Sequence, residues 1–276
     1  MAWCIGLFLS IFSVQMASAM GSGDLLASDS FIARSTVIVR WKEGGYCSGV
    51  LIARDLVLTA AHCVSKVVFS RRGDGTTEVK DLGERLPEET TVYFGNYLGQ
   101  EWKPKLDKAV EVVRPYPGAK FIAGPDLGLI KLKHQAQEPF KPAKIVPNRG
   151  ALKAGLPITI AGYGNLNEGI DVQEPVSHIL RSFKTLLYGM SSSEDGRKRL
   201  QLYKSQELPW LKTAYAAGDD EARKTIESSG MQSGDSGGPA FIQVADELQI
   251  VGIASGYDSE AHPSYENVVE HNEWIC

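Results

Sequence analysis

Short runs of apolar and β-branched residues recur along the chain, separated by glycine, proline, aspartate or other charged residues. Runs of this length are typical of strands rather than helices. The runs that we interpret as strands are residues 35–41, 48–54, 56–59, 91–94, 127–132, 157–162 and 248–254. Many short strands with turn residues between them predict an antiparallel β-sandwich or β-barrel.

Two regions depart from the strand pattern. Residues from about 176 to 228 are rich in Leu, Lys, Arg, Glu and Ala, and here we expect short helices in which Leu200, Tyr203 and Leu211 share one face. Charge-rich helices usually face solvent, although such a segment can also shape a binding site. Residues 267–275 predict a final short helix that packs Trp274.

The N-terminus has the pattern of an export signal. Residues 5–14 form an apolar run, and a helix that spans a bilayer needs about 20 residues, so this run is too short. Small residues follow at Ala17 and Ala19, which predicts cleavage after Ala19. A buried core strand is the alternative interpretation. We expect residues 1–19 to be a signal peptide and residues 20–276 to form one exported domain.

Composition excludes several classes of protein. The chain is 43% hydrophobic and 22% charged, which is enough apolar material for a core and rules out disordered, collagen-like and coiled-coil chains. A net charge of −4 gives no reason to expect a nucleic-acid partner or an anionic membrane. Cysteines stand at positions 4, 47, 63 and 276; export removes Cys4 and permits a disulfide.

Three segments carry candidate chemistry. The segment GDSGGP places Ser236 among glycines, which permit a tight turn and leave backbone N–H groups to stabilise an oxyanion. A serine needs a base within hydrogen-bond reach, and His62 in VLTAAHC can supply it. Asp126 opens the apolar segment DLGLIKL, where a carboxylate can fix the tautomer of a nearby imidazole.

In the order His62, Asp126, Ser236, these segments resemble the motifs of the chymotrypsin-like (trypsin-like) serine peptidases. The resemblance covers almost the whole chain from residue 20 onward and leaves only residues 180–228 without a clear match. It implies an all-β fold of two six-stranded antiparallel β-barrels with the active site in the cleft between them. A helical insertion near residues 180–228 and a C-terminal helix would be added to that fold.

The resemblance also implies a role for each motif residue. Ser236 would attack the scissile carbonyl, His62 would take and return the proton, and Asp126 would orient His62. The backbone N–H groups of Gly234 and Ser236 would form the oxyanion hole. Ser255 matches the family serine that supports the buried aspartate and begins the strand that pairs with substrate.

Cys47 and Cys63 match the family disulfide beside the catalytic histidine, while Cys276 has no predicted partner. The remaining histidines stand at positions 134, 178, 262 and 271 in polar surroundings, where we expect surface or loop positions. No pair of them has the spacing of metal ligands. We therefore expect no metal site and no cofactor.

The primary substrate pocket departs from the commonest pattern of the family. The residue six before the nucleophile, which lies at the base of this pocket, is Gly230, so a basic substrate side chain finds no counter-charge. Ser255, Gly256 and Tyr257 would also line the pocket. Its far wall would lie near residues 257–264, and Tyr257 stands where a glycine often leaves the entrance open. The disulfide that usually flanks the pocket is missing. We expect a small or apolar side chain to be preferred.

Activation is the other departure. Most members begin their mature chain with Ile-Val-Gly-Gly, whose ammonium pairs with the aspartate before the nucleophile, here Asp235. Counting back from Cys47 by the separation usual in the family reaches Gly21, next to Met20. We interpret Met20 as an activating N-terminus that signal cleavage itself creates. The alternative is an enzyme that orders its oxyanion hole only when a substrate or partner binds.

We therefore interpret the chain as a secreted serine endopeptidase, extracellular or periplasmic, that acts on protein or peptide substrates through an acyl-enzyme. We expect a monomer, with no nucleic-acid partner and no membrane association after signal cleavage. Activity should rise as His62 loses its proton, with a midpoint of about 6.5–7. The alternatives are a catalytically silent binding protein on the same fold, and an esterase or lipase, which the chain order and the all-β pattern disfavour.

Overall fold

The computed structural model describes residues 23–71, 77–95, 106–117, 124–147, 150, 152–164, 179–192, 198–228 and 231–276. The predicted signal peptide, Met20, Gly230 and His178 lie outside these ranges, so the expectations about them stay predictions.

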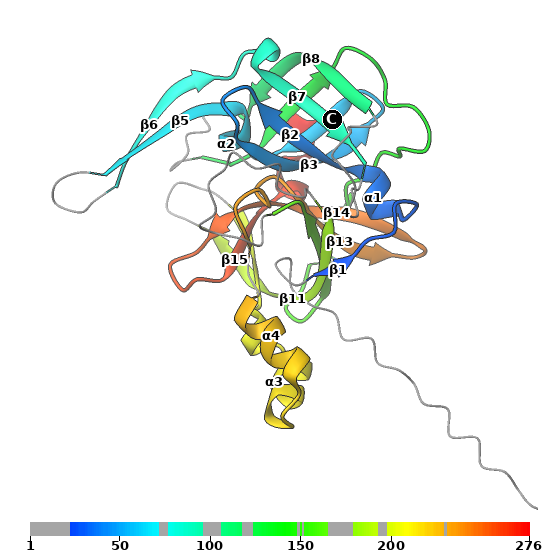
Figure 1. Ribbon diagram of the computed structural model, residues 1–276, viewed down its shortest axis with the longest axis vertical. Helices are drawn as coiled ribbons and strands as arrows, with labels where there is room; N and C mark the ends of the chain where they lie inside the picture. The colour runs from blue at the N-terminus through cyan, green and yellow to red at the C-terminus, as the bar shows by residue number, and fades with distance from the viewer. Residues whose placement is uncertain are drawn as a thin grey trace, which may run out of the picture.

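Six antiparallel strands close into a first barrel in the order β2-β3-β4-β9-β8-β7 (Figure 1). They are β2 (Thr36–Trp41), β3 (Tyr46–Ala53), β4 (Leu56–Thr59), β7 (Thr90–Phe94), β8 (Leu106–Pro115) and β9 (Gly128–Leu132). Burial alternates along β7 and β9, because successive side chains point into the barrel and out of it. The strands predicted at 35–41, 48–54, 56–59, 91–94 and 127–132 all lie in this barrel.

A second sheet has the order β1-β11-β10-β13-β14-β15-β12. Its strands are β1 (Asp24–Leu25), β10 (Pro157–Gly162), β11 (Arg181–Ser192), β12 (Lys198–Leu202), β13 (Pro239–Val244), β14 (Glu247–Tyr257) and β15 (Pro263–Asn267). The first half of β11 pairs with β10 and its second half with β12, so the sheet curls round into the second barrel. The expected two-barrel fold is therefore confirmed.

The helical insertion is shorter than predicted. Much of the segment expected to be helical is β11 and β12, and the helices begin only with η3 (Ser205–Glu207), α3 (Pro209–Ala216) and α4 (Asp220–Ser228). Leu200 lies in β12 and not on a helical face with Leu211. In β11 the buried Phe183, Thr185 and Leu187 alternate with more exposed residues, a strand period that the Leu- and Lys-rich composition hides.

The remaining elements lie at the edges of the two barrels. They are α1 (Phe31–Ser35), α2 (Ala61–Val64), the hairpin β5 (Ser65–Arg71) and β6 (Thr77–Glu84), η1 (Pro87–Glu89), η4 (Val268–His271) and α5 (Asn272–Ile275). The last two confirm the predicted C-terminal helix, and Trp274 packs against the core of the first barrel. Figure 1 shows α3 and α4 projecting from the second barrel on the side away from the first. Within the described ranges, no helix combines the length and apolar character needed to cross a bilayer.

Candidate active site

The pairing of β4 with β9 brings His62 and Asp126 together. Thr59 at the end of β4 lies opposite Gly128 at the start of β9, so the residues after one meet those before the other. His62 follows on α2, which packs against β9. A Cβ on Gly128 would lie only 2.5 Å from Val64 Cγ2, so the missing side chain lets α2 approach the strand this closely.

Asp126 is 4% exposed and accepts three hydrogen bonds. His62 donates its backbone N–H to Oδ1 at 3.0 Å, and its ring Nδ1 lies 2.8 Å from Oδ2. Ser255, at the end of β14 in the second barrel, donates its hydroxyl to Oδ2 at 2.6 Å. Because the carboxylate accepts at Nδ1, the proton of a neutral His62 ring sits there and Nε2 is left as the base.

The two members of this couple shift each other's protonation. Burial by itself would raise the pKa of Asp126, but the His62 charge and the hydrogen bonds from His62 and Ser255 lower that pKa to about 2. Burial likewise acts to lower the pKa of His62, and the Asp126 carboxylate outweighs it, so that pKa lies above its ordinary value of 6.5. The positive charge of Arg199 acts on His62 in the opposite direction.

The loop that carries Ser236 is anchored to the first barrel. Ser48 on β3 donates its N–H to the Ser236 carbonyl and its hydroxyl to the Gly234 carbonyl, both at 2.8 Å. Gly234 and Gly237 have φ of +98° and +79°, a backbone conformation that residues with a side chain rarely adopt. A Cβ on Gly237 would also overlap Thr59 Oγ1, so the loop sits directly against β4.

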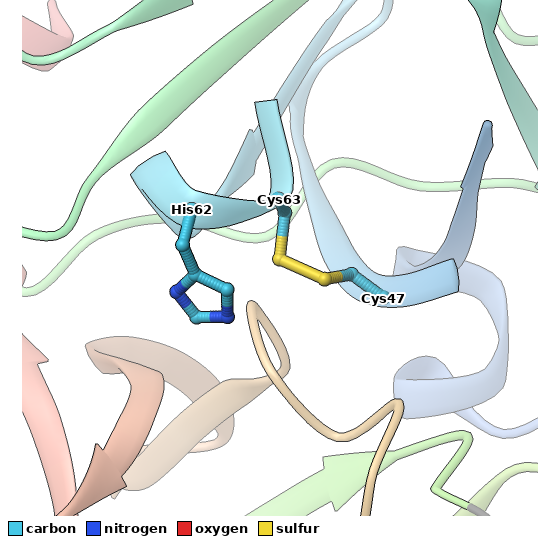
Figure 2. Close-up of side chains that lie close together, drawn as sticks. All are labelled: Cys47, His62 and Cys63. Atoms are coloured by element: carbon cyan, nitrogen blue, oxygen red, sulfur yellow. A yellow bond between two sulfur atoms is a disulfide. The ribbon is translucent and has the colours of Figure 1, made fainter. Parts of the chain in front are cut away.

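A disulfide joins Cys47 to Cys63 and braces this arrangement (Figure 2). Cys47 is the neighbour of Ser48, which holds the Ser236 loop, and Cys63 is the neighbour of His62. The prediction of this pair is confirmed. The two Sγ atoms and a ring nitrogen of His62 lie within 4.8 Å of one another, but sulfurs bonded to each other are not thiolate ligands.

The backbone N–H groups of the turn around Ser236 fall into two sets. The N–H groups of Asp235, Gly237 and Gly238 each donate to a backbone carbonyl. Those of Gly234 and Ser236 donate to no other described residue. These two are the groups expected to form the oxyanion hole, and a negatively charged oxygen is the acceptor that such paired donors stabilise.

Asp235 is fully buried behind the turn. Its two oxygens accept the N–H groups of Gly164 at 2.7 Å and Gln232 at 2.8 Å. Burial raises the pKa of Asp235 to about 7, although these N–H groups and the charge of Arg181 oppose the rise. Burial and the neighbouring Asp235 carboxylate raise the pKa of Tyr46 to about 12.

Three of the expected pocket residues, Ser255, Gly256 and Tyr257, lie on β14, and the Ser236 loop faces this strand. Backbone hydrogen bonds at 2.8 Å join Ala254 to the Ser236 loop through Gly237 and Gly238. Farther out, the hydroxyl of Tyr257 donates to the carbonyl of Met231 at 2.8 Å and so bridges the segments. No atom of the described residues lies within 4 Å of a Cβ built on Gly256, apart from its chain neighbours, so the strand is open to these residues there.

The role of Ser48 and the burial of His262 were not predicted from the sequence. Ser48 follows a cysteine in an ordinary strand and belongs to none of the three motifs. His262 lies in a loop, as predicted. Its surroundings are polar, but the side chain is 3% exposed, so these polar groups form a buried cluster and not a surface. Its ring nitrogens lie 3.3 Å from Asp258 and 3.4 Å from Glu207, and the ring stacks on Tyr188.

Comparison with known proteins agrees with the fold. The Trypsin family model matches residues 28–275, and the chain therefore belongs to the trypsin family, whose members are serine endopeptidases. The chain is 28% identical to the thrombin-like enzyme AhV_TL-I of Gloydius halys over 83% of each chain. It is 24% identical to the chymase of Rattus norvegicus over 99% of this chain and 96% of the chymase. The phenoloxidase-activating enzyme 1 of Spodoptera litura is 23% identical over 92% of this chain, which spans 65% of that enzyme.

Burial and the Asp126 charge have opposite effects on the pKa of His62, and a titration can measure their balance. In an NMR titration the His62 ring should have its midpoint above 6.5, because the Asp126 carboxylate stabilises the imidazolium. The substitution Asp126→Asn leaves the burial but removes the charge, so the midpoint should fall below 6.5. Glu247→Gln, at an exposed ion pair with Lys144, is the matched control and should not move it. A midpoint that Asp126→Asn leaves unchanged would contradict the assignment.

Proposed function

We propose that this protein is an exported serine endopeptidase that cleaves peptide bonds through an acyl-enzyme formed on Ser236. The observation that carries the proposal is the hydrogen-bonded chain from Ser255 through Asp126 to His62, placed beside the Ser236 loop. Asp126 stays ionised at neutral pH and stabilises the imidazolium that forms when His62 accepts the Ser236 proton. The N–H groups of Gly234 and Ser236 stabilise the oxyanion.

The same catalytic cycle ends with hydrolysis of the acyl-enzyme. His62 returns its proton to the leaving amine, then takes a proton from the attacking water and passes it to the Ser236 oxygen as the acid product leaves. An esterase on a strand-to-helix elbow is not supported, because the Ser236 loop runs directly into β13. The binding-protein alternative predicts a silent Ser236, and the first experiment below separates it from the proposal.

A fluorophosphonate probe tests the nucleophile directly. The mature protein should be labelled at about pH 8, where His62 is neutral, and labelling should decline below the midpoint of His62. Ser236→Ala should abolish labelling and lower peptide hydrolysis by about 10⁴-fold or more. Ser233→Ala, in the same turn, is the matched control and should keep both activities. No labelling of a folded parent protein would favour the binding protein.

We further propose that Met20, exposed by signal cleavage, supplies the ammonium that pairs with Asp235. Two observations support this. Strand β1 pairs with Arg181 and Ser182, close to the region where Gly164 holds Asp235, and four residues from Asp24 back to Met20 reach at most about 14 Å. A buried carboxyl with its pKa raised to about 7 is also a group that a cation would stabilise.

An N-terminal extension tests this pairing. In a variant with extra residues before Met20, Asp235 should keep its proton in the folded state up to about pH 7 against an ordinary pKa of 3.8. The unfolding free energy should then fall as pH rises from about 4 to about 7, and kcat/KM should drop by about 10-fold or more. Asp235→Asn should remove that pH dependence. N-terminal sequencing of the secreted protein that begins well beyond Met20 would overturn the proposal.

For substrate choice we propose a small residue on the amino side of the scissile bond. A side chain that extends from Ser236 between the two facing segments meets Tyr257, whose hydroxyl is bonded to Met231. Asp258 holds the following loop by accepting the N–H groups of Glu260 and His262. The hydrogen bonds of Tyr257 and Asp258 thus support the pocket wall in a chain that lacks the disulfide usual beside this pocket.

Cleavage of a peptide library tests the role of Tyr257. The parent should prefer Ala over Phe at this substrate position, and Tyr257→Gly should raise kcat/KM for Phe relative to Ala by about 10- to 100-fold. Tyr257 is 47% exposed, so the variant should fold, and Tyr215→Gly on α3 is the matched exposed control. A parent that prefers Phe, Leu or Arg would contradict the proposal.

A further inference from the structure

Strands β12 and β15 place two opposite charges side by side below the surface. Arg199 lies opposite Glu266 in the register of the strands, and its Nε donates to Glu266 Oε1 at 2.7 Å. Glu266 is 0% exposed and the side chain of Arg199 is 17% exposed. A carboxylate without solvent is costly unless a charge and hydrogen bonds compensate it, so each member of this pair requires the other.

The pair faces the first barrel. Leu200 and Tyr265, which are neighbours in the same two strands, point into the core of the second barrel. Side chains alternate along strands, so Arg199 and Glu266 point to the opposite face. Ile253, opposite Glu266 on β14, packs in the core cluster of the first barrel. The two charges therefore lie where the barrels meet.

This is the side on which the catalytic couple is held. Ser255, two residues after Ile253, donates to Asp126. The two charges of the pair act on the couple from there. The charge of Arg199 acts to lower the pKa of His62, against the raising effect of Asp126. Burial raises the pKa of Glu266, Arg199 opposes that rise, and the Asp126 charge adds to it.

The charged groups on the elements that pack against α2 are directed elsewhere. β5, β8 and β9 make these contacts. Their charged side chains in the described burial ranges are Lys66 (2.7 Å from Glu89), Lys131 (2.5 Å from Asp55), and the exposed Glu111 and Arg114. Asp126 faces His62 directly, and Arg199, which is paired with Glu266, is the other charge that shifts the pKa of His62.

We propose that Arg199 and Glu266 are a positioning pair that sets the proton affinity of His62. Arg199 neutralises Glu266 and thereby keeps a second carboxylate from acting on the imidazole together with Asp126. Without Arg199, His62 holds its proton to higher pH and is a base over a narrower range. Without Glu266, the unopposed guanidinium drives the proton off His62 earlier. The catalytic consequence rests on the proposed peptidase function.

Opposite signs in two single variants test the pair. By NMR, the His62 midpoint should rise by about half to one pH unit in Arg199→Met and fall by a similar amount in Glu266→Gln. Arg199→Lys and the double variant should return close to the parent value. Lys144→Met, which breaks an exposed ion pair at the far end of β14 from Ser255, should leave the midpoint unchanged. The midpoint of fluorophosphonate labelling should follow the same order.

Shifts of the same sign in the two single variants, or no shift in folded variants, would overturn the proposal. Thermal unfolding identifies the variants that fold. If Arg199→Met does not fold, the His62 midpoint of Glu266→Gln is compared with that of the double variant. The midpoint should be lower in Glu266→Gln, where the charge of Arg199 is still present. Loss of labelling in every protein, parent included, would refute the peptidase function alone, because the NMR titration still reports on the pair.

Discussion

The buried Asp126 carboxylate is the group on which the site depends. It takes a side-chain hydrogen bond from each barrel, from His62 after β4 and from Ser255 on β14. A carboxylate at this depth is stable only while these donors are present, and the imidazole keeps its orientation only while the carboxylate is charged. The ionised Asp126 carboxylate thus fixes the orientation of the His62 ring and joins the two barrels through Ser255.

Much of the fold could be predicted from the sequence because its strands have local sequence patterns. The β-branched runs of β2, β3, β4 and β10 have the length and bounding residues of strands, and all formed. The first half of the predicted helical insertion was wrong, since β11 combines an alternating buried face with a Leu- and Lys-rich composition typical of helices. In that strand the pairing with β10 and β12 outweighs local propensity.

The motif residues of the site were visible in the same way, and the groups that support them were not. His62, Asp126 and Ser236 each stand in a segment that carries its own chemistry. Ser48 holds the Ser236 loop through two hydrogen bonds, yet it is one more small residue in a strand. Arg199 and Glu266 are 67 residues apart, and only the register of β12 against β15 reveals that they are partners.

The division of Asp126's hydrogen bonds between the barrels also bears on how the chain matures. Either barrel folded alone would hold only part of the constellation, with the carboxylate lacking a donor or the serine loop lacking its anchor. Contacts between segments this distant in sequence form late, because closing long loops costs entropy before any contact compensates it. The arrangement of His62, Asp126 and Ser255 is therefore complete only once the two barrels have packed against each other.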